Sequence, residues 1–91
     1  MEANTQEFSE LELEEIIVNE HQVILYNDDV NTFDYVIELL IDVCGHEALQ
    51  AEQCAMLVHY KGKYAVKKGA FSELKKIHAQ LSSKGLTVEV E

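Results

Sequence analysis

The densest group of side chains that could do chemistry is the turn Asn27-Asp28-Asp29-Val30-Asn31. Its amide and carboxylate oxygens could ligate a hard cation, bind an ammonium group, or satisfy the backbone N–H groups of the turn itself. Read as a calcium loop, the segment supplies ligands at positions 1, 3 and 5, and Glu38 falls at position 12. The sixth position requires glycine and is Thr32, and a strand-like segment precedes the loop, so calcium binding is disfavoured.

Two cysteines and two histidines form a second possible group, Cys44, His46, Cys54 and His59. Their spacing matches none of the common zinc patterns. Both cysteines lie in apolar stretches without a basic neighbour, which predicts buried, unactivated thiols. The chain also has no Gly-rich phosphate loop and no Gly-x-Ser-x-Gly motif. We therefore expect no metal, no cofactor and no enzymatic activity. Taken alone, His59 at the end of an apolar helix is more often structural than functional.

Charge is distributed unevenly along the chain of 91 residues, whose formal net charge is −10. There is no arginine, and seven lysines face 17 acidic side chains, so nucleic-acid binding is disfavoured. Residues 1–20 contain seven glutamates and no lysine. We predict that residues 1–20 are an acidic, disordered extension and that residues 21–91 form one folded domain.

Several features bear on where the protein works. The N-terminus has neither a basic region nor an apolar core typical of a signal peptide. No apolar run approaches the roughly 18 residues of a membrane span. Two cysteines in apolar stretches are fewer than a disulfide-stapled secreted domain usually carries. We therefore expect a monomeric protein of the reducing cytoplasm that binds neither membranes nor nucleic acid.

Alternating and helical patterns predict the elements that must position these side chains. A β-branched strand covers 22–26, and a buried helix follows over about 32–44, with Asn31 as its N-cap. A second helix covers 48–59 and a third runs from 71 to 81. Strands are expected at 63–67 and 86–91, with turns at 60–62 and 68–69. The order β-α-α-β-α-β predicts a small α/β (α+β) sandwich in which three helices pack on a three-stranded sheet.

Two motifs at a fixed separation resemble the ClpS family of ATP-dependent Clp protease adaptors. Val23-Ile-Leu-Tyr-Asn-Asp-Asp29 is similar to the family's V-I-L-x-N-D-D signature, and Leu57-Val-His-Tyr-Lys-Gly-Lys63 to its x-V-H-Y-x-G-K segment. They align without gaps from Val23 to Lys63, and the resemblance covers about residues 21–91.

The resemblance implies a binding site for the free α-amino group of a substrate, made by Asn27, Asp29 with Asp28 beside it, and His59. An ammonium group has three donors, and these side chains supply three kinds of acceptor. An adjoining specificity pocket for bulky hydrophobic side chains is implied at Phe33, Val36, Leu39, Ala55 and Val58. Phe33 and Ala55 stand where the family commonly has methionine.

The same resemblance implies an adaptor that delivers N-degron substrates to the N-terminal domain of a Clp-type AAA+ unfoldase. Within the family, an extension such as residues 1–20 takes part in delivery. Two alternatives remain open from the sequence. One is a ClpS-like peptide-binding domain of another N-recognin, as in ubiquitin ligases, and the other is a small metal-binding protein.

Overall fold

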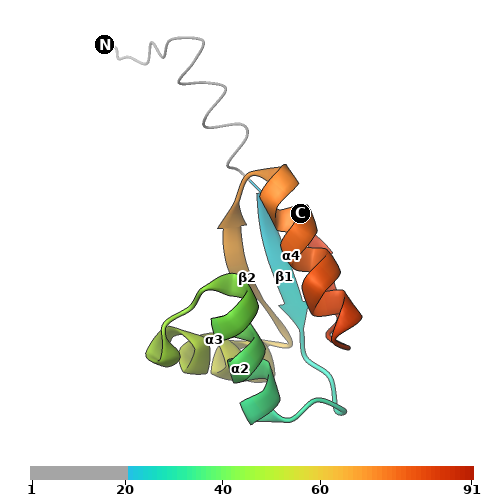
Figure 1. Cartoon of the computed structure of the whole chain (residues 1–91). Coiled ribbons are helices and arrows are strands. Elements are labelled where there is room, and N and C mark those ends of the chain that lie inside the picture. The colour runs from blue at the N-terminus through green and yellow to red at the C-terminus, as the bar shows by residue number, and fades with distance from the viewer. Residues whose placement is uncertain (1–20) are drawn as a thin grey trace, which may run out of the picture.

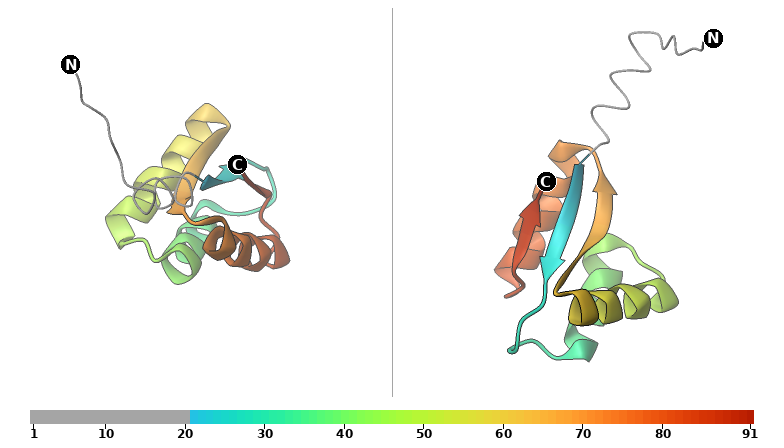
Figure 2. Two further views of the ribbon diagram at one scale, coloured as in Figure 1. Left: turned by 90° about the horizontal axis from the view of Figure 1, so that it is seen from above. Right: turned by 180° about the vertical axis from the view of Figure 1, so that it is seen from behind.

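A three-stranded antiparallel sheet forms one layer of the protein. The computed structural model describes residues 21–91. The central strand β1 (His21–Tyr26) pairs with β2 (Lys63–Gly69) on one side and with β3 (Val88–Val90) on the other. Figure 2 shows this arrangement from behind the molecule. The ladder shifts register between Val23 and Ile24, where β2 carries a bulge at Val66.

Three helices form the second layer. They are α2 (Phe33–Cys44), α3 (Ala48–Lys61) and α4 (Phe71–Ser83). In Figure 1, α4 runs along the sheet while α2 and α3 lie together at the end where β1 stops. Gly45 ends α2 with a φ of 75° and donates its N–H to Ile41 O, as its position after the apolar stripe predicted. The predicted order of elements and the three-stranded sheet are confirmed.

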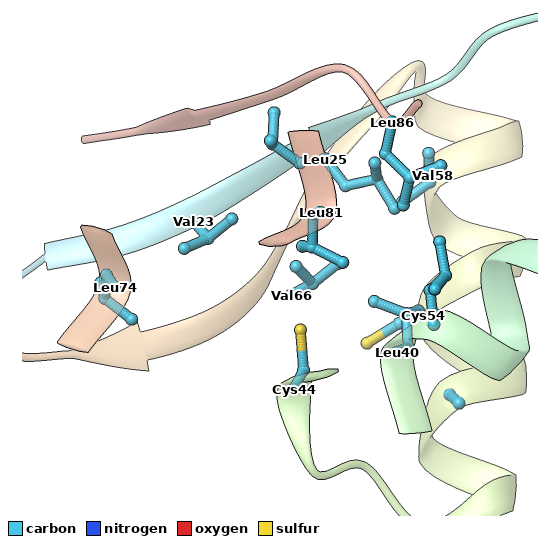
Figure 3. Packing of buried hydrophobic residues seen from close by; sticks show 13 residues of the cluster. Val23, Leu25, Leu40, Cys44, Cys54, Val58, Val66, Leu74, Leu81 and Leu86 are labelled. Carbon is cyan, nitrogen blue, oxygen red and sulfur yellow. The ribbon is translucent and has the colours of Figure 1, made fainter. Parts of the chain in front are cut away.

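The core lies between the two layers, and Figure 3 shows its packing. Alternate β1 residues Val23 and Leu25 point into it, as strand periodicity requires. The helices contribute Leu39, Leu40, Cys44, Ala51, Cys54, Val58, Leu74 and Leu81. Both cysteines are buried free thiols, as predicted. Burial raises the pKa of the Cys44 thiol to about 11.

Several boundaries differ from the sequence prediction. The cap of α2 is Thr32, whose hydroxyl accepts the Tyr35 N–H at 3.1 Å, so the assignment of Asn31 was wrong. The second helix continues through Lys61, where a turn was expected at 60–62. Strand β2 continues to Gly69 because that residue pairs with His21 across the sheet. The last strand begins at Val88 rather than at residue 86.

The predicted acidic extension, residues 1–20, lies outside the described residues. None of the helices in the described part is long and apolar enough to cross a membrane.

Candidate functional site

The turn after β1 is held in place by hydrogen bonds from three directions. The Asn27 N–H donates to Gly62 O at 2.9 Å, which joins the start of the turn to the end of α3. The Asp28 carboxylate accepts the N–H groups of Val30 and Asn31, both at 2.8 Å. The Asn31 amide donates to Asp28 Oδ2 at 2.9 Å and to Gly85 O at 3.0 Å. Hydrogen bonds therefore connect the turn both to the end of α3 and to the segment before β3.

These bonds explain why Asn31 does not cap α2. Its side chain links Asp28 to the loop that contains Gly85, so Thr32 caps the helix instead. Hydrogen bonds from the Asn31 backbone and side chain hold the pKa of Asp28 below its usual value, although partial desolvation opposes them. Asp28 therefore remains a carboxylate that organises the turn.

A cavity of about 270 Å³ opens beside this turn, where β1, α2 and α3 meet. Its polar part consists of Asn27, Asp28, Asp29, Asn31 and His59. Its apolar part consists of Leu25, Phe33, Val36, Ala55 and Val58. A single cavity thus combines a polar group with a hydrophobic wall.

The apolar wall is largely buried and the polar part is accessible. Leu25, Ala55 and Val58 are at most 5% exposed, because they also belong to the packed region between helices and sheet. His59 and Asn27 are exposed. His59 directly follows the buried residue Val58, and Asn27 directly follows the end of β1. Phe33, at 45% exposure, leaves part of its ring open to solvent. A ligand could therefore enter from solvent and place an apolar group against fixed walls.

Helical and strand geometry explain how distant residues meet here. Ala55 and Val58 are three positions apart on α3 and so share a face, and His59 follows at the next position. Val36 lies in the first turn of α2, whose start is fixed by the Thr32 cap. Because β1 ends at Tyr26, its next residue, Asn27, emerges at the edge of the core.

The cavity carries negative charge. Two of its lining residues are aspartates, and none of the ten is a lysine. Among the described residues, the Asp29 carboxylate, the Asn27 amide and the His59 imidazole take part in no internal hydrogen bond, so they remain available to a ligand. Acceptor atoms beside negative charge suit a cationic hydrogen-bond donor such as an ammonium group.

Of the nine residues that the sequence analysis assigned to the site, eight line this one cavity. The exception is Leu39, which is 5% exposed and packs in the hydrophobic core. The sequence analysis missed two lining residues, Leu25 and Asn31. Leu25 could have been found from its position two residues before Asn27, since both then lie toward the same side of the strand end.

The metal alternatives find no support in the described part of the chain. No group of three or more His, Cys, Asp or Glu side chains between residues 21 and 91 is arranged to hold a metal ion. Cys44, His46 and Cys54 are buried and line another cavity, whereas His59 lines the first one.

Several known proteins are similar to this chain in sequence. The chain is 46% identical over 46 residues to the ATP-dependent Clp protease adapter protein ClpS of Acetivibrio thermocellus, covering 50% of this chain and 46% of that protein. It is 40% identical over 42 residues to the ClpS of Campylobacter jejuni, covering 46% of this chain and 44% of that protein. The aligned part spans about half the length of the curated relatives it matches.

A solved structure shares the fold. The structure of Agrobacterium tumefaciens ClpS2 bound to L-phenylalaninamide superposes with a TM-score of 0.68 and 20% identity, covering 81% of this chain and 96% of that one. A family model for ATP-dependent Clp protease adaptor protein ClpS matches residues 18–89. This match includes the strand, the turn and all three helices, and the chain therefore belongs to the ClpS family.

Proposed function

We propose that this protein is an N-degron adaptor that binds substrates through a free α-amino group and a bulky hydrophobic N-terminal side chain, and delivers them to a Clp-type AAA+ unfoldase. The observation that carries this proposal is the single cavity in which Asn27, Asp29 and His59 adjoin the wall formed by Ala55 and Val58. Membership of the ClpS family supports it.

The polar part of the cavity would recognise the amino group. A protonated α-amino group offers three N–H donors and a positive charge, whereas an internal peptide bond offers one N–H and no charge. The amide oxygen of Asn27, the carboxylate of Asp29 and a ring nitrogen of His59 are the acceptors. The fixed carboxylate of Asp28 adds negative charge nearby. A site built for a charged donor discriminates strongly, because its own polar groups are left unpaired by a wrong ligand.

The apolar wall would recognise the first side chain. Burying a leucine or phenylalanine side chain from water contributes about 1.5–3 kcal/mol. The structural neighbour from Agrobacterium tumefaciens is described as bound to L-phenylalaninamide, which carries a free amino group and an aromatic side chain. That ligand has the two features that the cavity of this chain would bind.

The proposal also covers the protein's role, oligomeric state, location and partner in the cell. The protein acts as an adaptor rather than as an enzyme, works as a monomer in the cytoplasm, and needs no cofactor. Its partner is the N-terminal domain of the unfoldase. Buried, protonated thiols such as Cys44 suit a binding protein better than a nucleophilic catalyst.

The test is a titration with two peptides that differ only by acetylation of an N-terminal phenylalanine. The free peptide should bind and the acetylated peptide should not, because acetylation removes the charge and two of the donors. Chemical shift changes in labelled protein should map to Asn27, Asp29, Ala55 and His59. Equal binding of both peptides would refute amino-group recognition.

A further inference from the structure

A second cavity lies on the opposite side of α3. It has a volume of about 510 Å³ and is bounded by the end of α2, by α3 and by β2. Helix α3 presents Ala55, Val58 and His59 to the first cavity and Gln50, Gln53, Cys54 and Leu57 to the second. A ligand could therefore occupy this second cavity without entering the first.

The second cavity follows the free edge of the sheet. Five consecutive β2 residues, Tyr64 to Lys68, line it. Successive side chains of a strand point to opposite faces, so a cavity that touches all five runs along the edge of the strand. Within residues 21–91, β2 pairs with β1 on one side and with no strand on the other. An edge of this kind can pair with an added strand.

The charge of this edge is opposite to that of the first cavity. Its lining includes Lys67 and Lys68 and contains no aspartate or glutamate. All seven lysines of the chain lie between residues 61 and 84, where Glu73 is the only acidic side chain. The groove therefore carries two lysines and no acidic side chain on a protein whose net charge is −10, and the Lys67 ammonium also donates to Cys44 O at 3.1 Å.

A buried histidine lies in the same groove. His46 is 5% exposed and lines the cavity. Its Nε2 lies 2.6 Å from Val66 O, and a carbonyl only accepts, so Nε2 donates this hydrogen bond. Nδ1 has no hydrogen-bond partner among the described residues. The Nε2 hydrogen bond joins the loop after α2 to β2, which lie on two sides of the groove.

We propose that the groove between β2 and α3 binds an extended acidic segment of a partner protein, added as a strand along the free edge of β2. Backbone groups of the segment would pair with β2, and its carboxylates would lie beside Lys67 and Lys68. Apolar side chains on alternate positions would contact Leu57 and Tyr64. A free segment can adopt the antiparallel direction, which is slightly more stable per residue than the parallel one.

The experiment uses the full chain, labelled for NMR, and an acetylated and amidated peptide of about eight alternating valine and glutamate residues, the length of an ordinary strand. Acetylation prevents the peptide from using the amino-group site. The expected result is a set of saturable shift changes at residues 64–68 and at the His46 ring, with little change at Asn27 and His59. The affinity should fall as salt is added, because exposed charges are screened.

Two charge-reversal variants test whether the acidic peptide binds in this groove or is attracted to the lysines in general. Lys68→Glu changes a residue that lines the groove, and Lys76→Glu makes the same change on α4, outside it. We expect Lys68→Glu to weaken binding about fivefold and Lys76→Glu to leave it nearly unchanged, since the loss of one exposed pair is small and local. A matching valine–lysine peptide should not bind to the wild type.

Several outcomes would overturn this proposal. They are the absence of shifts at residues 64–68, equal binding of the acidic and basic peptides, or equal weakening by both variants. Contacts between residues 64–68 and residues 1–20 of the same chain, or a dimer joined through β2, would assign the edge to another occupant. Because the peptide is acetylated, each of these results is independent of whether the first cavity binds amino groups.

Discussion

The two neighbouring aspartates of the turn have different roles. The carboxylate of Asp28 is engaged by the N–H groups of Val30 and Asn31 and by the Asn31 amide, so it shapes the turn. Asp29 is exposed and lines the cavity, where its charge faces a ligand. Binding and positioning are thus divided between adjacent side chains. A substitution at either residue should accordingly have a different effect.

Removing an acceptor from the cavity should weaken binding without unfolding the protein. We expect Asn27→Ala and His59→Ala each to reduce affinity for a peptide with a free N-terminal phenylalanine at least about tenfold, or 1.4 kcal/mol. Both residues are exposed, so the melting temperature should change little. Fluorescence anisotropy measures the affinity. Met56→Ala, on α3 but outside the cavity, is the matched control. Wild-type affinity in the folded double variant would contradict the assignment.

Ala55 should widen the range of side chains that the cavity accepts. It is 4% exposed and contributes only a methyl group to the wall next to Val58. We expect peptides that begin with isoleucine or valine to bind within about tenfold of a leucine peptide. Ala55→Met should weaken these β-branched ligands by about 1–2 kcal/mol through overpacking, and affect leucine less. Isothermal titration of each of the three peptides with both proteins measures this. Rejection of isoleucine by more than about a hundredfold in the wild type would rule out a wide pocket.

At the scale of elements, the turn depends on the ionised form of Asp28. Its pKa is lower in the folded chain than in an unfolded one, because Asn31 donates to the carboxylate. The resulting stabilisation is present above the ordinary aspartate pKa, about 3.9, and is lost as the pH falls through the lower folded value. Asp28→Asn keeps the shape but lacks this charge. We expect it to be less stable than the wild type by about 1 kcal/mol at neutral pH.

Urea unfolding of the wild type and of Asp28→Asn, measured as a function of pH, checks this expectation. The gap between the two free energies of unfolding should be constant at neutral pH and narrow below about pH 4. Asp34→Asn, an exposed acidic residue in the first turn of α2, is a control for a general charge effect. Curves that stay parallel at acid pH would show that the Asp28 charge does not support the turn.

Periodicity predicted the order of elements but not all of their ends. The 3.6-residue and two-residue patterns arise because apolar side chains recur where a helix or strand faces the core. This spacing can be read from a short stretch of sequence. The extension of β2 to Gly69 depends on pairing with His21, a contact across the sheet. The cap of α2 depends on Asn31 being bound to Gly85, 54 positions away. Such long-range partners are absent from any local pattern.

The candidate site could be predicted largely because two motifs carry it. The turn Asn27 to Asp29 and His59 were identified by their resemblance to a known family, and the structure places them around one cavity. Leu39 does not line the cavity, because its side of α2 depends on how the helix is rotated against α3. The apolar stripe on α2 is wide enough to face both the core and the cavity. Only the packing of the helix decides which of its residues face the core and which line the cavity.

For the whole molecule, charge is arranged by region. Residues 21–60 contain seven acidic side chains and no lysine, and residues 61–84 contain seven lysines. The first region supplies the aspartates of the first cavity, and the second supplies the lysines of the groove beside β2. The molecule therefore offers ligands of opposite charge two separate surfaces.

The acidic segment before the domain is expected to act in delivery rather than in binding. Residues 1–18 contain six glutamates, and the cavity residues within the described part of the chain all lie between 25 and 59. We expect their deletion to leave affinity for a free N-terminal phenylalanine peptide unchanged and to slow degradation of a matching substrate by the partner protease. A fluorescent N-degron substrate measures the rate. Replacing the same residues by a neutral segment of equal length separates the effect of charge from that of length. Unchanged degradation by the truncated protein would refute a delivery role.

Helix α3 forms a wall of both cavities, and this has a thermodynamic consequence. A rigid helix cannot move toward one cavity without moving away from the other, because its two sides are fixed to one backbone. Any displacement that a ligand induces beside Ala55 and Val58 therefore reaches the surface formed by Gln53 and Leu57. If occupation of one side changes the affinity of the other, the coupling free energy is the same in both directions. Binding at one cavity could then be detected as a change in affinity at the other.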